Sequence, residues 1–266
     1  HIRISLAYVI MIILIWIPMA RRKSLAFLDV GQGDCFVADT KSGAIIFDGG
    51  SSSEDQVGRY RILPYMKYLG YQKIQIAVIS HMDIDHYSGI KELLEMGKIK
   101  YLGLPEIPKD ATMKKIIGIA KKRGTTIFYL SRGRQITTKD GSLKVLHPQK
   151  NSQMEKNAAS LVMQGKILGY RVLLTGDVEK EGEEELLSEE LERADILKAA
   201  HHGSKNSTSN EFLQKVQPKQ TVISCGKQNR YGHPHLETIH RLQTYHTKIY
   251  RTDRSGAIIF FKRRDG

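Results

Sequence analysis

The distribution of hydrophobic residues divides the chain near residue 21. Residues 4–20 carry no charged side chain, and Arg21, Arg22 and Lys23 follow directly. At about 1.5 Å per helical residue, this segment nearly spans a bilayer core of about 30 Å. Trp16, close to the basic end, is typical of an anchor at the membrane interface. We therefore expect residues 1–23 to form one transmembrane helix with a basic flank.

A signal peptide is the alternative interpretation of this segment. It is the weaker one, because only Arg3 supplies charge before the apolar run and no clear cleavage site of small residues precedes the basic cluster. The positive charges that follow the run favour a cytoplasmic position for its basic end.

Beyond Lys23, short apolar runs alternate with stretches of helical periodicity. The apolar runs predict strands at residues 24–29, 35–38, 44–47, 74–80, 100–104, 126–130, 134–147, 161–165, 170–175, 196–200, 220–225, 248–250 and 257–262. The periodic stretches predict helices at residues 56–69, with a possible break at Pro64, and at 87–96, 111–122, 179–191, 210–216 and 236–245. We expect an α/β domain over residues 24–266. Two sheets packed together with helices on the outside would accommodate these elements.

Composition narrows the class of protein. Of the 266 residues, 41% are hydrophobic, which is enough for a core and excludes a disordered chain. The two cysteines, Cys35 and Cys225, exclude a disulfide framework and a cysteine-rich zinc module, so a metal site must use histidines and carboxylates. With 41 Lys and Arg against 28 Asp and Glu, the net charge of +13 favours an anionic partner such as nucleic acid or a membrane surface.

The densest chemical signal directly follows the apolar strand predicted at residues 74–80. Within six residues, HMDIDH, it holds His81, Asp83, Asp85 and His86. A loop at a strand end can turn several side chains toward one point. Imidazole nitrogens and carboxylate oxygens suit Zn²⁺, Mn²⁺ or Fe²⁺. A solvated polar loop is the alternative, disfavoured by four possible ligands in so short a stretch.

Further candidates lie at the ends of other predicted strands. LLTGD ends in Asp177, AAHHGS presents His201, His202 and Ser204, and NRYGHP presents His233. A single Gly-Asp turn is weak by itself, but polar side chains at four strand ends are typical of a metal hydrolase. The turn GQGD at residues 31–34 lacks the GK[ST] of a phosphate-binding loop, and we expect a tight turn between two core strands there.

These segments resemble the metallo-β-lactamase superfamily. HMDIDH is similar to its HxHxDH signature, with Asp83 in place of the second histidine, and FDGG at residues 47–50 is similar to its structural Asp motif. LLTGD resembles the segment with its bridging Asp, and AAHHGS its last histidine motif. More narrowly, LDVGQGD, SHMDIDH, TGD, LKAAHHGS, NRYGHP and YRTDRSG stand in the order of the C-terminal domain of the ComEC competence-protein family, a bacterial DNA-uptake channel.

The resemblance runs from about residue 24 to the C-terminus and implies a fold, partners and a location. The fold is the αββα sandwich of the superfamily, here preceded by the predicted membrane helix. The partners are DNA, the membrane and the rest of a multi-span channel, and the location is the bacterial cell membrane. The oligomeric state stays open.

The resemblance also implies a ligand set for two divalent metal ions, Zn or Mn. One metal takes His81 and Asp83, the other takes Asp85, His86 and His201, and Asp177 bridges them. His233 is then a candidate for phosphate stabilisation or leaving-group protonation, and His202 and Ser204 are candidates for supporting or substrate contacts. The superfamily's further histidine, between the first cluster and the bridging Asp, has no confident counterpart among His147, Asn157 and Ser160.

We expect a metal-dependent phosphodiesterase, in particular a nuclease acting on DNA during uptake. Two alternatives stay open at this stage. One is a hydrolase of a small phosphodiester such as a phosphocholine ester, because one scaffold hosts many chemistries. The other is a non-catalytic module that binds DNA or gates a channel.

Overall fold

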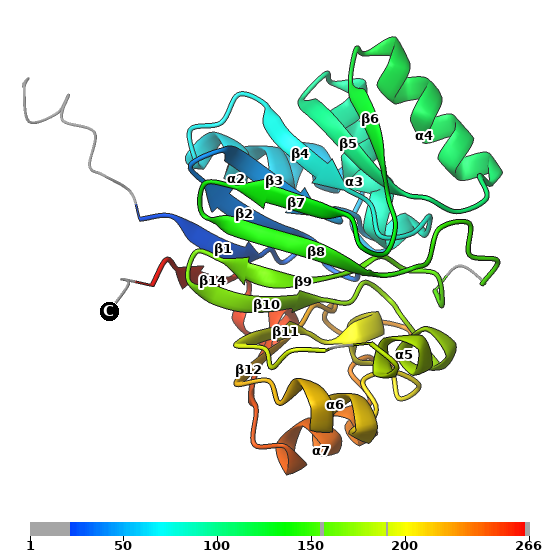
Figure 1. Ribbon diagram of the computed structural model, residues 1–266. Helices are drawn as coiled ribbons and strands as arrows, with labels where there is room; N and C mark the ends of the chain where they lie inside the picture. The colour runs from blue at the N-terminus through cyan, green and yellow to red at the C-terminus, as the bar shows by residue number, and fades with distance from the viewer. Residues whose placement is uncertain (1–21, 155–156, 190, 264–266) are drawn as a thin grey trace, which may run out of the picture.

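Two β-sheets packed face to face form the centre of the computed structural model, which describes residues 22–154, 157–189 and 191–263 (Figure 1). In this part of the chain each sheet has seven strands. The first sheet contains, in spatial order, β14 (Ile258–Phe261), β1 (Ser24–Phe27), β2 (Phe36–Thr40), β3 (Gly43–Phe47), β4 (Ile74–Val78), β5 (Ile99–Pro105) and β6 (Thr126–Leu130). The second contains β13 (Lys248–Arg251), β12 (Gln220–Ile223), β11 (Ile196–Lys198), β10 (Tyr170–Leu174), β9 (Val162–Ile167), β8 (Gly141–His147) and β7 (Gln135–Thr138).

The two sheets share one pattern of strand directions. In the first, the pairs from β14 to β3 are antiparallel and those from β3 to β6 are parallel. In the second, the pairs from β7 to β10 are antiparallel and those from β10 to β13 are parallel. Parallel strands need crossover connections, and these carry the helices onto the outer faces.

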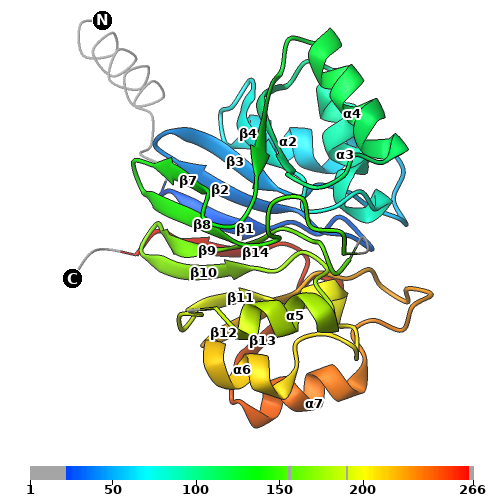
Figure 2. The same ribbon diagram turned by 45° about the vertical axis from the view of Figure 1, so that its right-hand side comes forward.

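Helices cover the outer face of each sheet (Figures 1 and 2). The first sheet is covered by η1 (Gly58–Ile62), α2 (Leu63–Tyr68), α3 (Ile84–Glu95) and α4 (Ala111–Lys122). The second is covered by α5 (Lys180–Leu187), α6 (Asn210–Val216) and α7 (Leu236–Thr244). The short helices η2 (Ala200–Gly203) and α8 (Thr252–Ser255) lie in the connections after β11 and β13.

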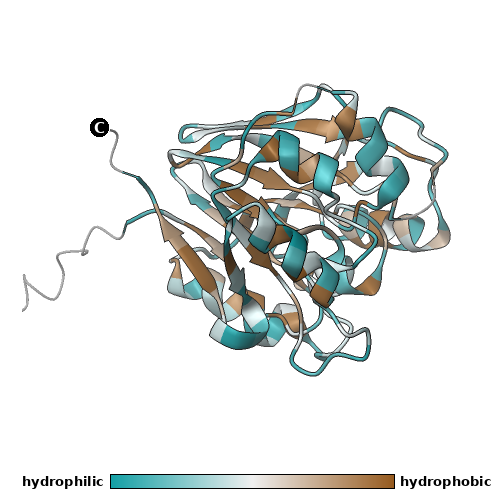
Figure 3. Cartoon of the chain, turned by 90° about the horizontal axis from the view of Figure 1, so that it is seen from below, coloured by the Kyte–Doolittle hydropathy of each residue, from teal (hydrophilic) through white to brown (hydrophobic). Residues whose placement is uncertain are grey.

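The hydrophobic core forms three apolar layers. The central layer lies between the sheets and includes Phe27 against Phe36, with ring centroids 5.0 Å apart. The outer layers lie between each sheet and its helices. Coloured by hydropathy, the strands are largely apolar and the helices contain both hydrophilic and hydrophobic residues (Figure 3). Residues that alternate along each strand therefore bury both faces of both sheets, which explains the strongly apolar strand sequences.

The predicted αββα sandwich is confirmed. The hairpin predicted at residues 161–175 is β9 and β10, and the helix predicted at 56–69 divides into η1 and α2 just before Pro64. The helix predicted at 179–191 is shorter, because α5 ends at Leu187. The predicted transmembrane helix lies outside the described residues, and within the described part no helix combines the length and apolarity needed to cross a membrane.

Candidate metal centre

The HMDIDH segment runs from the loop after β4 into the first turn of α3. Asp83 occupies the position before the first turn of α3, and Asp85 and His86 lie within that turn. Main-chain hydrogen bonds from His86 N and Tyr87 N to Asp83 O close the turn. A negative side chain in the first turn of a helix is favoured by the helix dipole. The loop therefore follows from local sequence: an apolar strand ends, and a helix begins directly after the acidic residue Asp83.

Two other turns support this loop through their backbones. Asp34 N donates to Asp85 O (3.0 Å), Gly49 N donates to His86 O (2.8 Å), and Gly50 N donates to Asp34 O (3.1 Å). A Cβ on Gly50 would lie 2.6 Å from the backbone of Asp85 and His86. The GQGD segment is thus the tight turn that the sequence predicts, but it also packs against the candidate metal loop.

The AAHHGS segment forms a strained turn at the end of β11. Both histidines have left-handed backbone conformations, with φ 48° and ψ 49° at His201 and φ 54° and ψ 21° at His202. This region costs a non-glycine residue about 1–3 kcal/mol, and such strain gathers at functional sites. The turn directs the two adjacent imidazoles differently: His202 is buried, whereas the His201 side chain is 24% exposed.

Each imidazole of the centre is held at its Nδ1 atom. The Nδ1 contacts are His86 with Asp48 Oδ2 (3.0 Å), His202 with Ser224 O (2.9 Å), His201 with Glu179 Oε1 (2.7 Å) and His81 with Ser80 Oγ (3.0 Å). Carboxylates and carbonyls only accept hydrogen bonds, so Nδ1 of His86, His201 and His202 carries the proton. The Nε2 atoms are then left to bind a metal, which is the usual arrangement around metal-ligating histidines.

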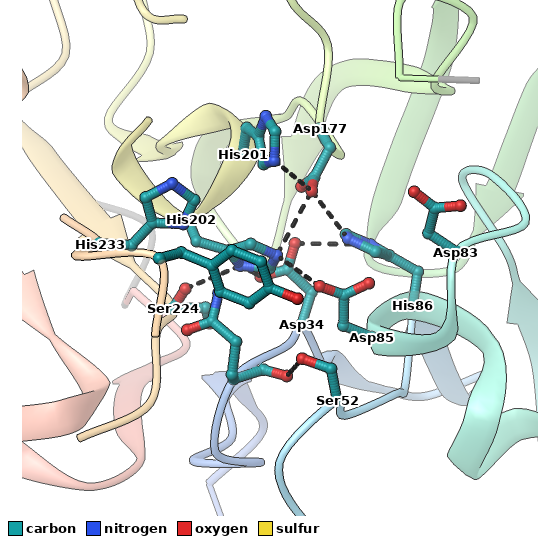
Figure 4. A network of polar contacts seen from close by, with 12 residues as sticks. Asp34, Ser52, Asp83, Asp85, His86, Asp177, His201, His202, Ser224 and His233 are labelled. Carbon is teal, nitrogen blue, oxygen red and sulfur yellow. Dashed lines mark hydrogen bonds and ion pairs between the residues drawn. The ribbon is translucent and has the colours of Figure 1, made fainter. Parts of the chain in front are cut away.

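The Nε2 atoms converge on Asp177 (Figure 4). Asp177 Oδ2 lies 3.1 Å from His86 Nε2, 3.3 Å from His202 Nε2 and 3.8 Å from His201 Nε2. Asp85 Oδ2 lies 3.3 Å from His202 Nε2. Tetrahedral zinc with bonds of about 2.0–2.1 Å has ligand atoms about 3.3 Å apart, close to these separations.

Buried nitrogen atoms without hydrogen bonds give an independent test of the fit. Within the described residues, Nε2 of His81, His86 and His202 is buried and makes no hydrogen bond of ordinary geometry. A buried polar group left unsatisfied costs about 1–3 kcal/mol. A divalent cation at this place would satisfy these atoms, so the residues present fit a metal site.

Asp34 is the unexpected member of the cluster. Together with His86, Asp177 and His202 it offers ligand atoms that all lie within 4.8 Å of one another, and all four residues are buried. Its oxygens, however, face the Nδ1 atoms of His86 (3.7 Å) and His202 (3.6 Å), on the sides opposite the free Nε2 atoms. Asp34 therefore supports the two imidazoles from behind.

Lys198 brings a buried positive charge into the same cluster. Its Nζ contacts Asp34 Oδ2, lies 3.3 Å from Asp177 Oδ1 and donates to Gly176 O at 2.8 Å. Burial acts to lower the pKa of Lys198, but the adjacent Asp34 and Asp177 carboxylates raise it above its ordinary value. Lys198 is thus a charged internal link between the two carboxylates.

The electrostatics of the metal-free centre follow from this crowding. Burial acts to raise the pKa of Asp177, but His202, His86 and Lys198 hold it well below its ordinary value. Burial acts to lower the pKa values of His86 and His202, and the charge of Asp177 overrides this and raises both. In His81, by contrast, burial and the nearby His86 lower the pKa to about 3. The centre therefore keeps its carboxylates ionised, as a cation site requires.

A cavity of about 240 Å³ opens onto the centre. Among the residues predicted from the sequence, Asp83, Asp85, Asp177, His201, His202 and His233 line it. Asp83 Oδ2 lies 3.7 Å from His81 Nε2, and the rings of His81 and His86 are 4.1 Å apart. Burial, together with the neighbouring His202 and His201, lowers the pKa of His233 to about 4, so at neutral pH it is an uncharged hydrogen-bonding group.

Two predicted positions differ in the structure. Ser204 is buried in the turn, where its carbonyl accepts from Thr238 Oγ1 (2.8 Å), and it does not line the cavity. His202, predicted as a supporting residue, lies with its Nε2 3.3 Å from both Asp177 Oδ2 and Asp85 Oδ2, while Nε2 of His201, the predicted ligand, lies 3.8 Å from Asp177 Oδ2. The metal-ligand assignment itself stays a prediction.

Neither His147 nor Ser160 supplies the superfamily's additional histidine ligand to the cavity. His147 is buried and contacts Glu185 (3.1 Å) and the Ala158 carbonyl (2.6 Å), so it is away from the cavity. Ser160 Oγ accepts from Asp177 N at 3.3 Å. The side of the centre near Asp83 is consequently poorer in nitrogen ligands than the side near His86.

Asp34 and Lys198 belong to the centre but are not among the site residues predicted from the sequence. A lysine in the otherwise apolar strand before AAHHGS was the available signal for Lys198, because an unpaired lysine is almost never fully buried. For Asp34 the signal was weaker, since an acidic residue after a glycine turn is common.

An αββα sandwich with a cluster of His and Asp side chains at the ends of its strands is the arrangement of the metallo-β-lactamase fold class. The profile described as "Metallo-beta-lactamase superfamily" matches residues 28–227, and the chain belongs to this superfamily. Within it, the chain is homologous to the metallo-β-lactamase domain of the ComEC/ComA/Rec2 competence proteins.

Curated relatives carry this narrower assignment. The chain is 34% identical to ComE operon protein 3 of Bacillus subtilis, over 97% of this chain and 35% of the relative. It is 31% identical to competence protein ComA of Neisseria gonorrhoeae, over 90% of this chain and 32% of the relative. The chain thus spans about a third of the length of the curated relatives it matches.

Solved structures agree with the fold. The metallo-beta-lactamase fold protein YhfI of Bacillus subtilis superposes with a TM-score of 0.59 at 14% identity, covering 89% of this chain and 99% of YhfI. The short form of human tRNase Z superposes with a TM-score of 0.53 at 13% identity, covering 91% of this chain and 100% of that structure. At these identities the likeness concerns the fold alone.

Proposed function

We propose that this domain is a metal-dependent phosphodiester hydrolase, specifically a nuclease acting on DNA in a competence membrane protein. The observation that carries the proposal is the set of imidazoles held at Nδ1 whose Nε2 atoms gather around the buried Asp177. The names of the relatives support a role in competence, and the net charge of +13 favours a polyanionic substrate.

The residues of the centre have two roles in the proposed hydrolysis: some would bind the cations, and others orient the imidazoles. Divalent cations, Zn or Mn, supply an activated water and polarise the phosphoryl oxygens when bound. His86, His202, Asp85 and Asp177 would hold one cation, and His81, Asp83 and Asp177 would hold a second one with fewer nitrogen ligands. Asp48, Ser224 and Glu179 fix the ring orientations from behind.

Water adds to phosphorus and the ester oxygen leaves with a proton, giving a phosphomonoester and an alcohol. His233 lines the cavity beside His201 and His202, with ring centroids 5.4 Å and 6.1 Å away. An uncharged imidazole keeps one N–H, so His233 can still donate a hydrogen bond to a phosphoryl oxygen.

The decisive test is the Asp85→Ala variant, assayed with Mn²⁺, Zn²⁺ and Mg²⁺ on single- and double-stranded DNA and on a small phosphodiester. We expect DNA cleavage to fall about a thousandfold, equivalent to about 4 kcal/mol, because a ligand of the better-formed position is lost. DNA binding should persist, since it depends on distributed Lys and Arg contacts. Asp55→Ala removes an exposed carboxylate of the same charge and serves as the matched control.

The outcomes separate the alternatives. A wild-type domain that cleaves only the small ester, in an Asp85-dependent way, is a small-phosphodiester hydrolase. A folded, metal-loaded domain that cleaves neither substrate with any metal is a non-catalytic module, and the hydrolase proposal is then refuted.

A further inference from the structure

A second cavity lies directly beside the metal-facing one. It also has a volume of about 240 Å³ and is formed by the segment 226–231 after β12 and by the turn that holds Ser52 and Ser53. Three residues line both cavities and so form the wall between them: Gln32, Ser52 and Tyr231. A ligand in the second cavity would therefore be a close neighbour of a phosphate at the metal centre.

The dividing wall contains a buried donor that has no partner. Gln32 is 2% exposed, and its Oε1 accepts from Gly226 N at 3.0 Å, which fixes the orientation of the amide. Its Nε2 is buried and makes no hydrogen bond within the described residues. Since an unsatisfied buried donor costs about 1–3 kcal/mol, this atom points to an acceptor supplied by a ligand.

The cavity is built in advance of any ligand. Asn229 ties its own loop together: its Nδ2 donates to Gly226 O (2.9 Å) and His233 O (2.6 Å), and its Oδ1 accepts from the main chain of Tyr231 (3.2 Å). On the other side, Ser53 Oγ accepts from Gln32 N at 2.8 Å. The two loops approach so closely that a Cβ on Gly226 would lie 2.8 Å from Gln32 N.

The second cavity has a positively charged lining, which favours an anionic ligand. Lys227 and Arg230 are exposed on it, and no acidic residue lines it. Arg230 donates one N–H to Tyr231 Oη (2.7 Å), and a guanidinium has five donors in all. By contrast, a third cavity of about 340 Å³ meets the metal-facing one at Ile84, and its lining has more acidic than basic residues: Glu54, Asp55 and Glu92 against Lys91 and Lys115. A polyanion leaving the metal centre is therefore favoured on the Lys227 side.

We propose that this second cavity binds the phosphodiester adjacent to the scissile one, with Gln32 Nε2 donating to a phosphate oxygen and Lys227 and Arg230 neutralising its charge. This assignment rests on the proposed function and deepens it. It makes the preferred substrate a strand with at least one more phosphate next to the bond that is cleaved, and it disfavours a small isolated diester.

The test compares a thymidine dinucleotide with and without a terminal phosphate. We expect the wild-type domain to cleave the terminally phosphorylated form with about tenfold higher kcat/KM, the size of one charge-assisted hydrogen bond. The double variant Lys227→Ala/Arg230→Ala should lose that preference. Lys121→Ala/Lys122→Ala removes the same charge from the exposed end of α4 and should keep it. Equal rates for the two dinucleotides in the wild type, or a preference that survives in the first variant, would overturn the assignment.

A binding measurement separates this proposal from the proposed function. In the metal-free protein, the phosphorylated dinucleotide should bind about tenfold more tightly than the unphosphorylated one, without any need for cleavage. Gln32→Glu keeps the acceptor for Gly226 N and replaces the donor by a carboxylate oxygen, so it should abolish this difference. If no diester is hydrolysed but the affinity difference holds, the proposed nuclease function fails and the anion site stands. If hydrolysis proceeds and the affinities are equal, the anion site fails alone.

Discussion

The two segments that supply the histidines of the centre are built in opposite ways. The HMDIDH loop is supported by neighbouring backbones, with main-chain hydrogen bonds from Asp34 and Gly49 to the carbonyls of Asp85 and His86. The AHHG turn instead holds two successive residues in left-handed conformations. The first places its side chains through an ordinary strand-to-helix connection, and the second through backbone strain.

This difference decides what each segment contributes. In the loop, the consecutive residues Asp85 and His86 both reach the centre: Asp85 Oδ2 lies 3.3 Å from His202 Nε2, and His86 Nε2 lies 3.1 Å from Asp177 Oδ2. In the turn, adjacent histidines separate: His202 Nε2 comes within 3.3 Å of both Asp177 and Asp85, while His201 Nε2 stays 3.8 Å from Asp177. Both consecutive side chains of the loop therefore reach the centre, whereas in the strained turn His202 lies closer to Asp177 than the adjacent His201 does.

Asp177 is the residue on which the two segments meet, and Asp177→Asn should have the largest effect. It removes the charge facing His86 from the loop and His202 from the turn. We expect a loss of at least about a thousandfold in metal-dependent phosphodiester hydrolysis, or about 4 kcal/mol. Rates and bound metal should be measured together, with Asp55→Asn as the exposed control. Full activity with full metal content in Asp177→Asn would show that the segments act independently.

Lys198, at the end of β11, forms ion pairs with the buried Asp34 and Asp177, and Lys198→Met removes both pairs. Removing one partner of a buried charge cluster should lower the free energy of unfolding of the metal-free protein by about 3 kcal/mol, measured by urea denaturation. Lys219→Met is the matched control: its ion pair with Asp195 (3.1 Å) is largely solvent-exposed on the lysine side, so the expected loss is under about 1 kcal/mol. Equal losses in the two variants would contradict a structural charge at Lys198.

His202→Asn and His201→Asn test whether the two adjacent histidines contribute unequally to metal binding and hydrolysis. His202 is buried among carboxylates, whereas the His201 side chain is 24% exposed, so we expect about a hundredfold loss in kcat/KM for the first and less than tenfold for the second. Metal affinity should change in the same order. The reverse order would restore His201 to the ligand position that the sequence interpretation gives it.

The backbone support of the loop is probed by Gly50→Ala. The new Cβ would meet the Asp85 and His86 backbone at 2.6 Å, so we expect a loss of about 2 kcal/mol in the free energy of unfolding, together with weaker metal binding. Gly118→Ala, inside α4 with no atom within 4 Å of the new Cβ, should instead stabilise by up to about 1 kcal/mol. If Gly50→Ala behaves like Gly118→Ala, the backbones do not support the loop in the way described.

Much of the fold could be predicted because its evidence is local. Apolar runs such as the one before His81 give strands, periodic stretches such as 111–122 give helices, and both match the structure closely. The boundaries of 56–69 and 179–191 are less accurate, because helix ends depend on packing and capping as well as on the pattern.

For the site, the sequence alone determined that histidines and carboxylates stand at the ends of apolar strands, which is a local property of chain order. It identified the loop, the Asp177 turn and the paired histidines. Only the tertiary structure decided that Asp34 lies behind two imidazoles, that Lys198 joins two buried carboxylates, and that His202 approaches Asp177 more closely than His201 does. The physical reason is that side-chain direction at these positions depends on contacts between segments far apart in the chain and on a strained turn, neither of which a residue pattern encodes.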